Sequence, residues 1–134
     1  MATIRLEQRL PHPPSRVWSA LTDPAMLAGW LMPNDFLPRL GHGFSFDTGG
    51  RGRTQCEVVE LTPGRRVADS WRNPPLDTIV TWTVTPDGDG TLLTLEHSGF
   101  DLDDPRQRFA HEGMSSGWGS MLAGRLPSLL AGTN

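Results

Sequence analysis

The sequence contains no lysine and no tyrosine, and its only cysteine is Cys56. The absence of lysine excludes a lysine Schiff base and the lysine of a phosphate-binding P-loop, and the absence of tyrosine excludes a tyrosine general acid. A single cysteine cannot form an intramolecular disulfide, which is typical of proteins in a reducing compartment. Together with an N-terminus that lacks the apolar core of a signal peptide, this predicts a cytoplasmic protein.

The charge is close to balanced, and long hydrophobic runs are missing. Twelve basic residues, all of them arginine, stand against 15 acidic residues and give a net charge of −3. This excludes the basic surface that nucleic acid or an acidic membrane would require. No apolar run approaches the roughly 20 residues of a membrane span. The length of 134 residues predicts one domain over residues 1–134, large enough to bury its own core.

The residue pattern predicts a strand, two short helices, several more strands and a long C-terminal helix. The first strand ends at Pro11, proline and serine after it are typical of a helix start, and Asp23-Pro24 separates the two short helices. Alternating residues follow, with a glycine-rich turn at Gly49–Gly52 and the strongest strand signal at residues 78–85 (TIVTWTVT). We therefore expect an α+β fold with a curved antiparallel sheet of about six to seven strands.

The C-terminal region changes to helical spacing. Its apolar stripe comprises Met114, Trp118, Met121, Leu122, Arg125, Leu126 and Leu129. Four glycines interrupt the same region, each costing up to about 1 kcal/mol relative to alanine: Gly113, Gly117, Gly119 and Gly124. They indicate close backbone approach, a kink or a longer loop, and Pro127 is expected to kink or end the last turn. We expect the curved sheet to wrap around this helix, because that arrangement buries the apolar stripe.

Three segments carry a resemblance to a known family. These are residues 17–24 (VWSALTDP), residues 41–46 (GHGFSF) and residues 96–100 (EHSGF). In this order they resemble the START-like (SRPBCC) superfamily with the helix-grip fold, and most closely the branch named for the activator of the Hsp90 ATPase. The resemblance implies a cavity for hydrophobic small molecules between the sheet and the C-terminal helix. It also implies that some relatives are polyketide cyclases and others co-chaperones.

Strand alternation selects one candidate pair for acid–base chemistry. His97 shares a strand face with Leu93 and Leu95, and Trp82 shares one with other bulky residues, so both are expected on the concave face. A carboxylate such as Asp69 would orient a histidine and raise its basicity, which makes His97 with Asp69 the candidate catalytic pair. The alternative is that His97 is a structural histidine whose hydrogen bonds are satisfied at a strand end.

Aromatic and thioether side chains form a candidate ligand-binding set, because they supply large and adaptable apolar area. The set comprises Phe44, Trp71, Trp82, His97, Met114, Trp118 and Met121. The alternative is that these residues are ordinary core. The four histidines are scattered and no metal-binding motif occurs, so we expect neither a metal nor a cofactor.

Three hypotheses of function follow. The first is binding of a hydrophobic small molecule, which is lipid-, aromatic- or polyketide-like, without catalysis. The second is an enzyme of the polyketide cyclase or dehydratase type that uses His97 with Asp69. The third is an interaction module for a chaperone of the Hsp90 type. Exposed strands at the sheet edges would allow a homodimer as well as a monomer.

Overall fold

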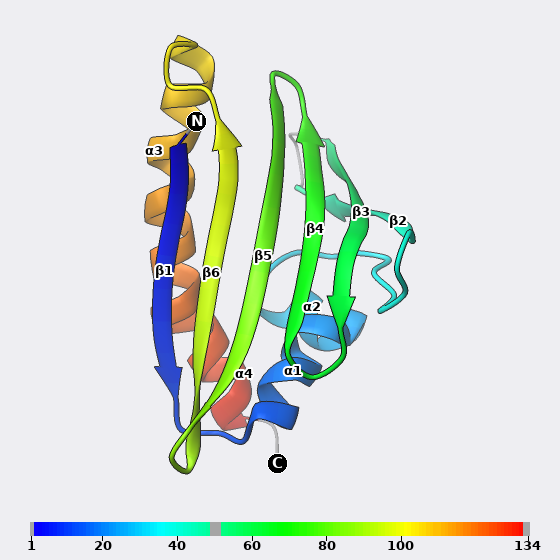
Figure 1. The fold of residues 1–134 in the computed structure, drawn as a ribbon, viewed down its shortest axis with the longest axis vertical. Helices are drawn as coiled ribbons and strands as arrows, with labels where there is room; N and C mark the ends of the chain where they lie inside the picture. The colour runs from blue at the N-terminus through cyan, green and yellow to red at the C-terminus, as the bar shows by residue number, and fades with distance from the viewer. Residues whose placement is uncertain (1, 49–51, 133–134) are drawn as a thin grey trace.

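A six-stranded antiparallel sheet, strongly curved, forms one layer of the molecule (Figure 1). The computed structural model describes residues 2–48 and 52–132, so most of the expected turn at 49–52 lies outside the described residues. The strands are β1 (Ala2–Leu10), β2 (Gly43–Asp47), β3 (Arg53–Thr62), β4 (Arg66–Asn73), β5 (Leu76–Asp87) and β6 (Gly90–Phe100). Their order in the sheet is β1-β6-β5-β4-β3-β2, so β1 and β2 are the edges.

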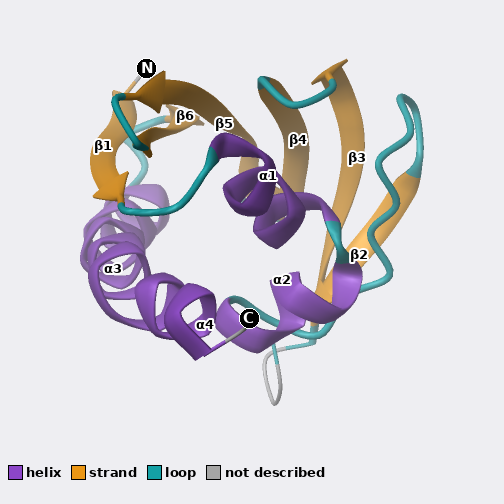
Figure 2. Cartoon of the chain, turned by 90° about the horizontal axis from the view of Figure 1, so that it is seen from below, coloured by secondary structure: helices purple, strands orange, loops and turns teal. Residues whose placement is uncertain are grey.

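All helices lie on the concave side of this sheet, inside the arc of strands (Figure 2). They are α1 (Pro14–Thr22), α2 (Pro24–Trp30), α3 (Pro105–Ser120), the π-helical turn η2 (Met121–Arg125) and α4 (Leu126–Gly132). This arrangement confirms the predicted α+β helix-grip architecture. Within the described ranges, no helix is long and apolar enough to span a membrane.

Proline and aspartate define where the helices begin. Each of α1, α2 and α3 has proline in its first turn, where a missing backbone N–H costs nothing. Asp23 ends α1 and caps α2, because its Oδ1 accepts hydrogen bonds from the N–H groups of Ala25 (2.9 Å) and Met26 (3.2 Å). This one residue is therefore both the C-cap of α1 and the N-cap of α2.

The C-terminal helix passes through Pro127 instead of ending there. Proline has no N–H to donate to Ala123, and the turn before it widens, with the N–H of Leu126 bonding to the carbonyl of Met121. Gly124 lies in this widened turn. Close backbone approach does not explain Gly113, because a Cβ built there would have no other atom within 4 Å.

The register of the sheet places the predicted inward residues in rows across the concave face. Asp69 pairs with Val80, and Val80 pairs with His97, so these three side chains share one row. His97 and Trp82 are buried, as expected for the concave face. Asp69 therefore also lies on the concave face, because directly paired residues share a face of the sheet.

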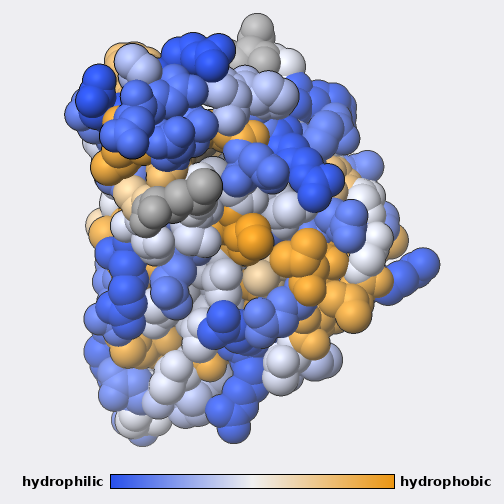
Figure 3. All heavy atoms as spheres, turned by 45° about the horizontal axis from the view of Figure 1, so that its top comes forward, coloured by the Kyte–Doolittle hydropathy of each residue, from blue (hydrophilic) through white to orange (hydrophobic). Residues whose placement is uncertain are grey.

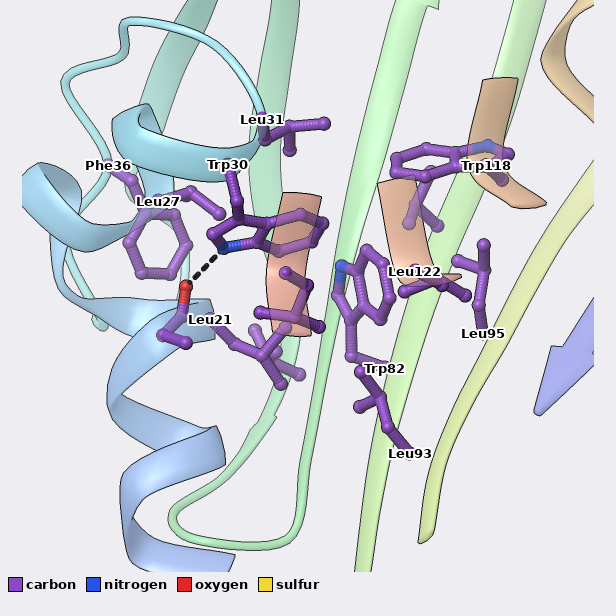
Figure 4. Packing of buried hydrophobic residues seen from close by; sticks show 14 of the residues in the cluster. Leu21, Leu27, Trp30, Leu31, Phe36, Trp82, Leu93, Leu95, Trp118 and Leu122 are labelled. Carbon is purple, nitrogen blue, oxygen red and sulfur yellow. Dashed lines mark hydrogen bonds between the residues drawn. The ribbon is translucent and has the colours of Figure 1, made fainter. Parts of the chain in front are cut away.

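Tryptophans from three different elements meet beneath the helices (Figure 4). The ring of Trp82 from β5 makes edge-to-face contacts with Trp30 from α2 and with Trp118 from α3, at 5.6 and 5.5 Å between ring centres. The indole N–H of Trp30 is satisfied, since it donates to the carbonyl of Ala20 at 2.8 Å. These contacts join the helices to the sheet at the centre of the core.

We predict that Asp23→Ala lowers the free energy of unfolding by about 1 kcal/mol, because two N–H groups of α2 lose their acceptor. Urea unfolding followed by tryptophan fluorescence measures the change. Asp23→Asn is the matched control, since its amide oxygen still accepts both bonds. Equal destabilisation by the alanine and asparagine variants would contradict the capping role.

Candidate functional site

The first turns of α3 lie beside one edge of the sheet, where the ring of His111 contacts Phe100 of β6 at 5.0 Å between ring centres. Within α3, all of which the structure describes, only Trp118 is buried, whereas the following turns bury Leu122, Leu126 and Leu130. The packing of α3 on the sheet is mainly against β1 and β6. The concave face of the central strands is therefore left uncovered beside the first turns of α3.

A cavity of about 750 Å³ fills this space. Its walls are α3, the turn between β4 and β5, the facing ends of β2 and β3, and the residues at the end of α2. This volume lies within the range of about 300–1,000 Å³ that is typical of small-molecule sites. On the end of the molecule where α3 begins, hydrophobic surface shows between the hydrophilic residues (Figure 3).

Four of the seven predicted ligand-binding residues line the cavity: Trp71, Met114, Trp118 and Met121. The other three do not line it. Phe44 packs against Phe36 and Phe46 at 5.0 and 5.4 Å between ring centres, and Trp82 lies between Trp30 and Trp118. His97 is wholly buried beneath the cavity floor.

The remaining cavity wall contains residues that strand alternation did not select. Gly113 and Gly117 line it from α3, and the segment 73–76 lines it from the β4–β5 turn. Two exposed residues of α3, Arg106 and Phe109, stand where the cavity opens to solvent. The glycines could be singled out from the sequence, because glycine is costly inside a helix. That two of them line a cavity could not be predicted, because it depends on the position of α3.

A chain of hydrogen bonds runs from one tryptophan of the cavity to the other through His97. The indole N–H of Trp118 donates to Nδ1 of His97 at 3.1 Å. Nε2 of His97 lies 2.8 Å from Oγ1 of Thr78, which donates to the carbonyl of Trp71 at 3.2 Å. Because an indole nitrogen is only a donor, Nδ1 must be the acceptor, so the imidazole is neutral and Nε2 carries the proton.

This chain determines what His97 can do. Burial, with a smaller contribution from the charge of His111, lowers its pKa to about 4. Both ring nitrogens are already engaged, so neither has a free lone pair to accept a proton from a bound molecule. In this arrangement His97 holds Trp118 against the sheet.

Asp69 lies on the same face as His97 but apart from it. Val80 separates them in the register, which corresponds to about 10 Å between the two strands. Burial raises the pKa of Asp69 to about 7, and Oδ1 has no hydrogen-bond partner among the described residues. Burial is also the main cause of the raised pKa of the Cys56 thiol, with the charge of Asp69 contributing less. The structure thus does not bring Asp69 and His97 together as a hydrogen-bonded pair.

No candidate metal site forms around these residues. Within the described ranges, no three side chains of His, Cys, Asp or Glu gather closely enough to hold an ion.

Comparison with protein families identifies the group to which this architecture belongs. The family model described as activator of Hsp90 ATPase homolog 1-like protein matches residues 11–131. The chain belongs to this family. No protein of curated function matches it significantly.

Solved structures of this family superpose closely on the chain. Protein MLL2253 from Mesorhizobium loti is 36% identical with a TM-score of 0.88, and 99% of each chain is covered. DynU16, from the dynemicin biosynthetic locus, is 26% identical with a TM-score of 0.80; the match covers 97% of this chain and 47% of DynU16. The Aha1 dimer from Colwellia psychrerythraea is 19% identical with a TM-score of 0.83 over the full length of both chains, a likeness of fold.

The two buried titratable groups predict opposite dependences of stability on pH. Between pH about 4 and 6.5, His97 binds a proton in the unfolded chain but not in the folded chain, so its contribution to stability rises with pH. Between pH 3.8 and about 7, Asp69 binds a proton in the folded chain but not in the unfolded chain, so its contribution falls as pH rises. We expect the two effects largely to cancel.

Substituting one of these two groups should leave only the pH dependence of stability that the other contributes. Asp69→Asn is expected to make stability rise with pH over this window, and His97→Gln is expected to make it fall, each by up to about 1.4 kcal/mol per pH unit. Urea unfolding at pH 4.5, 5.5 and 6.5 measures the slopes. Parallel profiles of both variants and the unsubstituted protein would contradict the assignment.

Proposed function

We propose that this protein binds a hydrophobic small molecule in the cavity between α3 and the sheet. The observation that carries the proposal is the cavity of about 750 Å³ floored by Trp71 and Trp118. The ring of Trp118 is held in place before any ligand arrives, because its N–H donates to His97, which is itself bonded to Thr78.

The distribution of polarity in the cavity supports an apolar ligand. Leu31, Leu76, Met114 and Met121 add to the tryptophans, and methionine adapts to ligands of irregular shape. The polar lining residues, Asp47, Thr48, Thr54, Asn73 and Arg106, are fewer than the apolar ones. Arg106 is exposed at the opening, where it pairs with Asp104 at 3.3 Å and where a polar end of the ligand would meet it. The place of DynU16 in a biosynthetic locus agrees with a role close to small-molecule chemistry.

The geometry of His97 and Asp69 favours a binding function over an enzyme that would use this pair for catalysis. A cyclase or dehydratase that used His97 with Asp69 would need a free nitrogen on His97 and access for its substrate, whereas both nitrogens are engaged and the ring is buried. Interaction with a chaperone of the Hsp90 type stays a prediction from the family relationship. The oligomeric state and the cytoplasmic location stay predictions from the sequence.

Ala110→Phe tests the cavity, because it places a ring in the lining of α3. Isothermal titration with 1-anilinonaphthalene-8-sulfonate and with palmitate is expected to show saturable one-to-one binding by the unsubstituted protein. We expect the variant to bind each ligand that titrates at least about tenfold more weakly, a difference of about 1.4 kcal/mol.

Ala28→Phe is the matched control, since Ala28 is exposed on α2 and does not line the cavity. It is expected to leave the affinity unchanged. Equal losses in the two variants would refute binding in this cavity, and so would the failure of both probes to show saturable binding.

A further inference from the structure

We propose that this protein forms a two-fold symmetric dimer in which β1 pairs antiparallel with β1 of a second copy, so that two sheets join into one. The pairing is centred on Leu6, and Arg5 of each copy faces Glu7 of the other. This interface lies at the edge of the sheet and does not depend on the proposed function of the cavity.

The edge of the sheet at β2 is covered by the chain itself. The N–H of Asp47 donates to the carbonyl of Pro33 at 2.9 Å, and the N–H of Ser45 donates to Oδ1 of Asp35 at 2.8 Å. The segment before β2 therefore takes the place that a further strand would need. Such cover is a common way to prevent pairing between sheet edges.

The opposite edge, β1, has no such cover. Among the described residues its backbone pairs with β6 alone, and one side chain, that of Gln8, donates to the carbonyl of Arg9 at 3.3 Å. Figure 1 shows β1 as the outermost strand, with α3 behind it on the concave side. Alternate N–H and C=O groups of an edge strand point away from its neighbour, so β1 presents a row of groups with which a further strand can pair.

Two-fold symmetry restricts how β1 can pair with its own copy. Directly opposite residues share a face, so only a pairing centred on a residue keeps both concave faces on one side of the joined sheet. Because β1 has nine residues, Ala2–Leu10, pairing along its whole length is centred on Leu6. In this register Arg5 lies opposite Glu7 of the other copy, and this pair of charges occurs twice. Opposite charges directly across a ladder are favourable.

The neighbouring registers bring like charges together. Centred on Arg5, the pairing sets this arginine against its own copy; centred on Glu7, it sets two glutamates against each other and Arg5 against Arg9. Charged side chains commonly protect an edge strand from pairing. On β1 they repel a copy in the neighbouring registers and attract it in the register that uses the whole strand, so the charge pattern selects one alignment.

The side chains of this edge are available for the pairing. Arg5 and Glu7 keep 56% and 43% of their side-chain surface exposed, although they contact each other at 3.4 Å within one chain. Leu6 is half-buried on the concave face, where it packs against the core. At the centre of the dimer, Leu6 of the second copy would cover its remaining apolar surface.

Charge reversal tests the register. Sedimentation equilibrium of the unsubstituted protein is expected to show a monomer–dimer equilibrium, with a dissociation constant on the order of 10 μM for so small an interface. Arg5→Glu and Glu7→Arg should each weaken the dimer at least about tenfold, because two attractive pairs become repulsive. An equimolar mixture of the two variants should dimerise again, since every facing pair then carries opposite charges.

The control for these variants is a charge reversal away from β1. Arg72→Glu makes the same change of charge at an exposed ion pair with Asp77, and it should leave the dissociation constant unchanged. Glu96 of β6 lies opposite Arg5, so thermal unfolding first establishes that Arg5→Glu is folded. The double variant that exchanges Arg5 and Glu7 should dimerise like the unsubstituted protein.

Cysteine cross-linking tests the centre of the pairing without a change of charge. Opposite residues of an antiparallel pair have Cα atoms about 4.5–5.5 Å apart, which a disulfide can bridge. Mild oxidation should therefore convert Leu6→Cys into a covalent dimer. Gln8→Cys should stay monomeric under the same conditions, because Gln8 and its copy are about 14 Å apart in this register. The native Cys56 is buried and does not compete.

A protein that stays monomeric up to about 1 mM would overturn the proposal. So would a dimer that persists in both charge-reversal variants, or a mixture of these variants that stays monomeric. Equal cross-linking of Leu6→Cys and Gln8→Cys would place the interface in another register or on another surface, and it would overturn the pairing centred on Leu6.

Discussion

The hydrogen bond from Trp118 to His97 fixes the point at which the C-terminal helix leaves the sheet. After this point along the chain, Leu122, Leu126 and Leu130 are buried against the core; before it, no residue of α3 is buried. An indole has one donor and the engaged nitrogen of His97 has one lone pair, so the contact is specific in direction. The cavity lies beside the turns before this residue, which contact β1 and β6 but leave the central strands uncovered.

The two halves of the concave face differ in whether their buried polar atoms have hydrogen-bond partners. Around Trp30 and Trp82 the rings interlock, and the N–H of Trp30 has its acceptor. Asp69 and Trp71, on neighbouring inward positions of β4, each retain a buried polar atom without a partner among the described residues. Each such atom costs about 1–3 kcal/mol. Ser70, between them on the opposite face of β4, also has a buried hydroxyl without a partner among the described residues, so the unsatisfied groups follow this strand and are not confined to the cavity side.

Much of the fold could be predicted from the sequence because strand alternation and proline positions are local signals. The face on which Trp82 and His97 lie followed from alternation alone. The lining of the cavity could not be predicted in the same way, because alternation gives the face of a residue but not its depth. Trp82 lies on the correct face, yet Trp30 and Trp118 cover it. Likewise, the place of Gly113 in the cavity lining depends on the position of α3 beside the sheet, which contacts distant in sequence determine, among them those of Trp118 with His97 and of His111 with Phe100.

Nuclear magnetic resonance of the indole N–H groups would test the central claim most directly, since the five tryptophans sample different parts of the molecule. During titration with 1-anilinonaphthalene-8-sulfonate, we expect saturable shifts of the Trp71 and Trp118 signals, because both residues line the cavity. The signals of Trp18 on α1 and of Trp30, which is bonded to Ala20, should stay in place. Shifts confined to Trp18 or Trp30, or no saturable shift of any indole signal, would contradict the claim that this cavity binds the ligand.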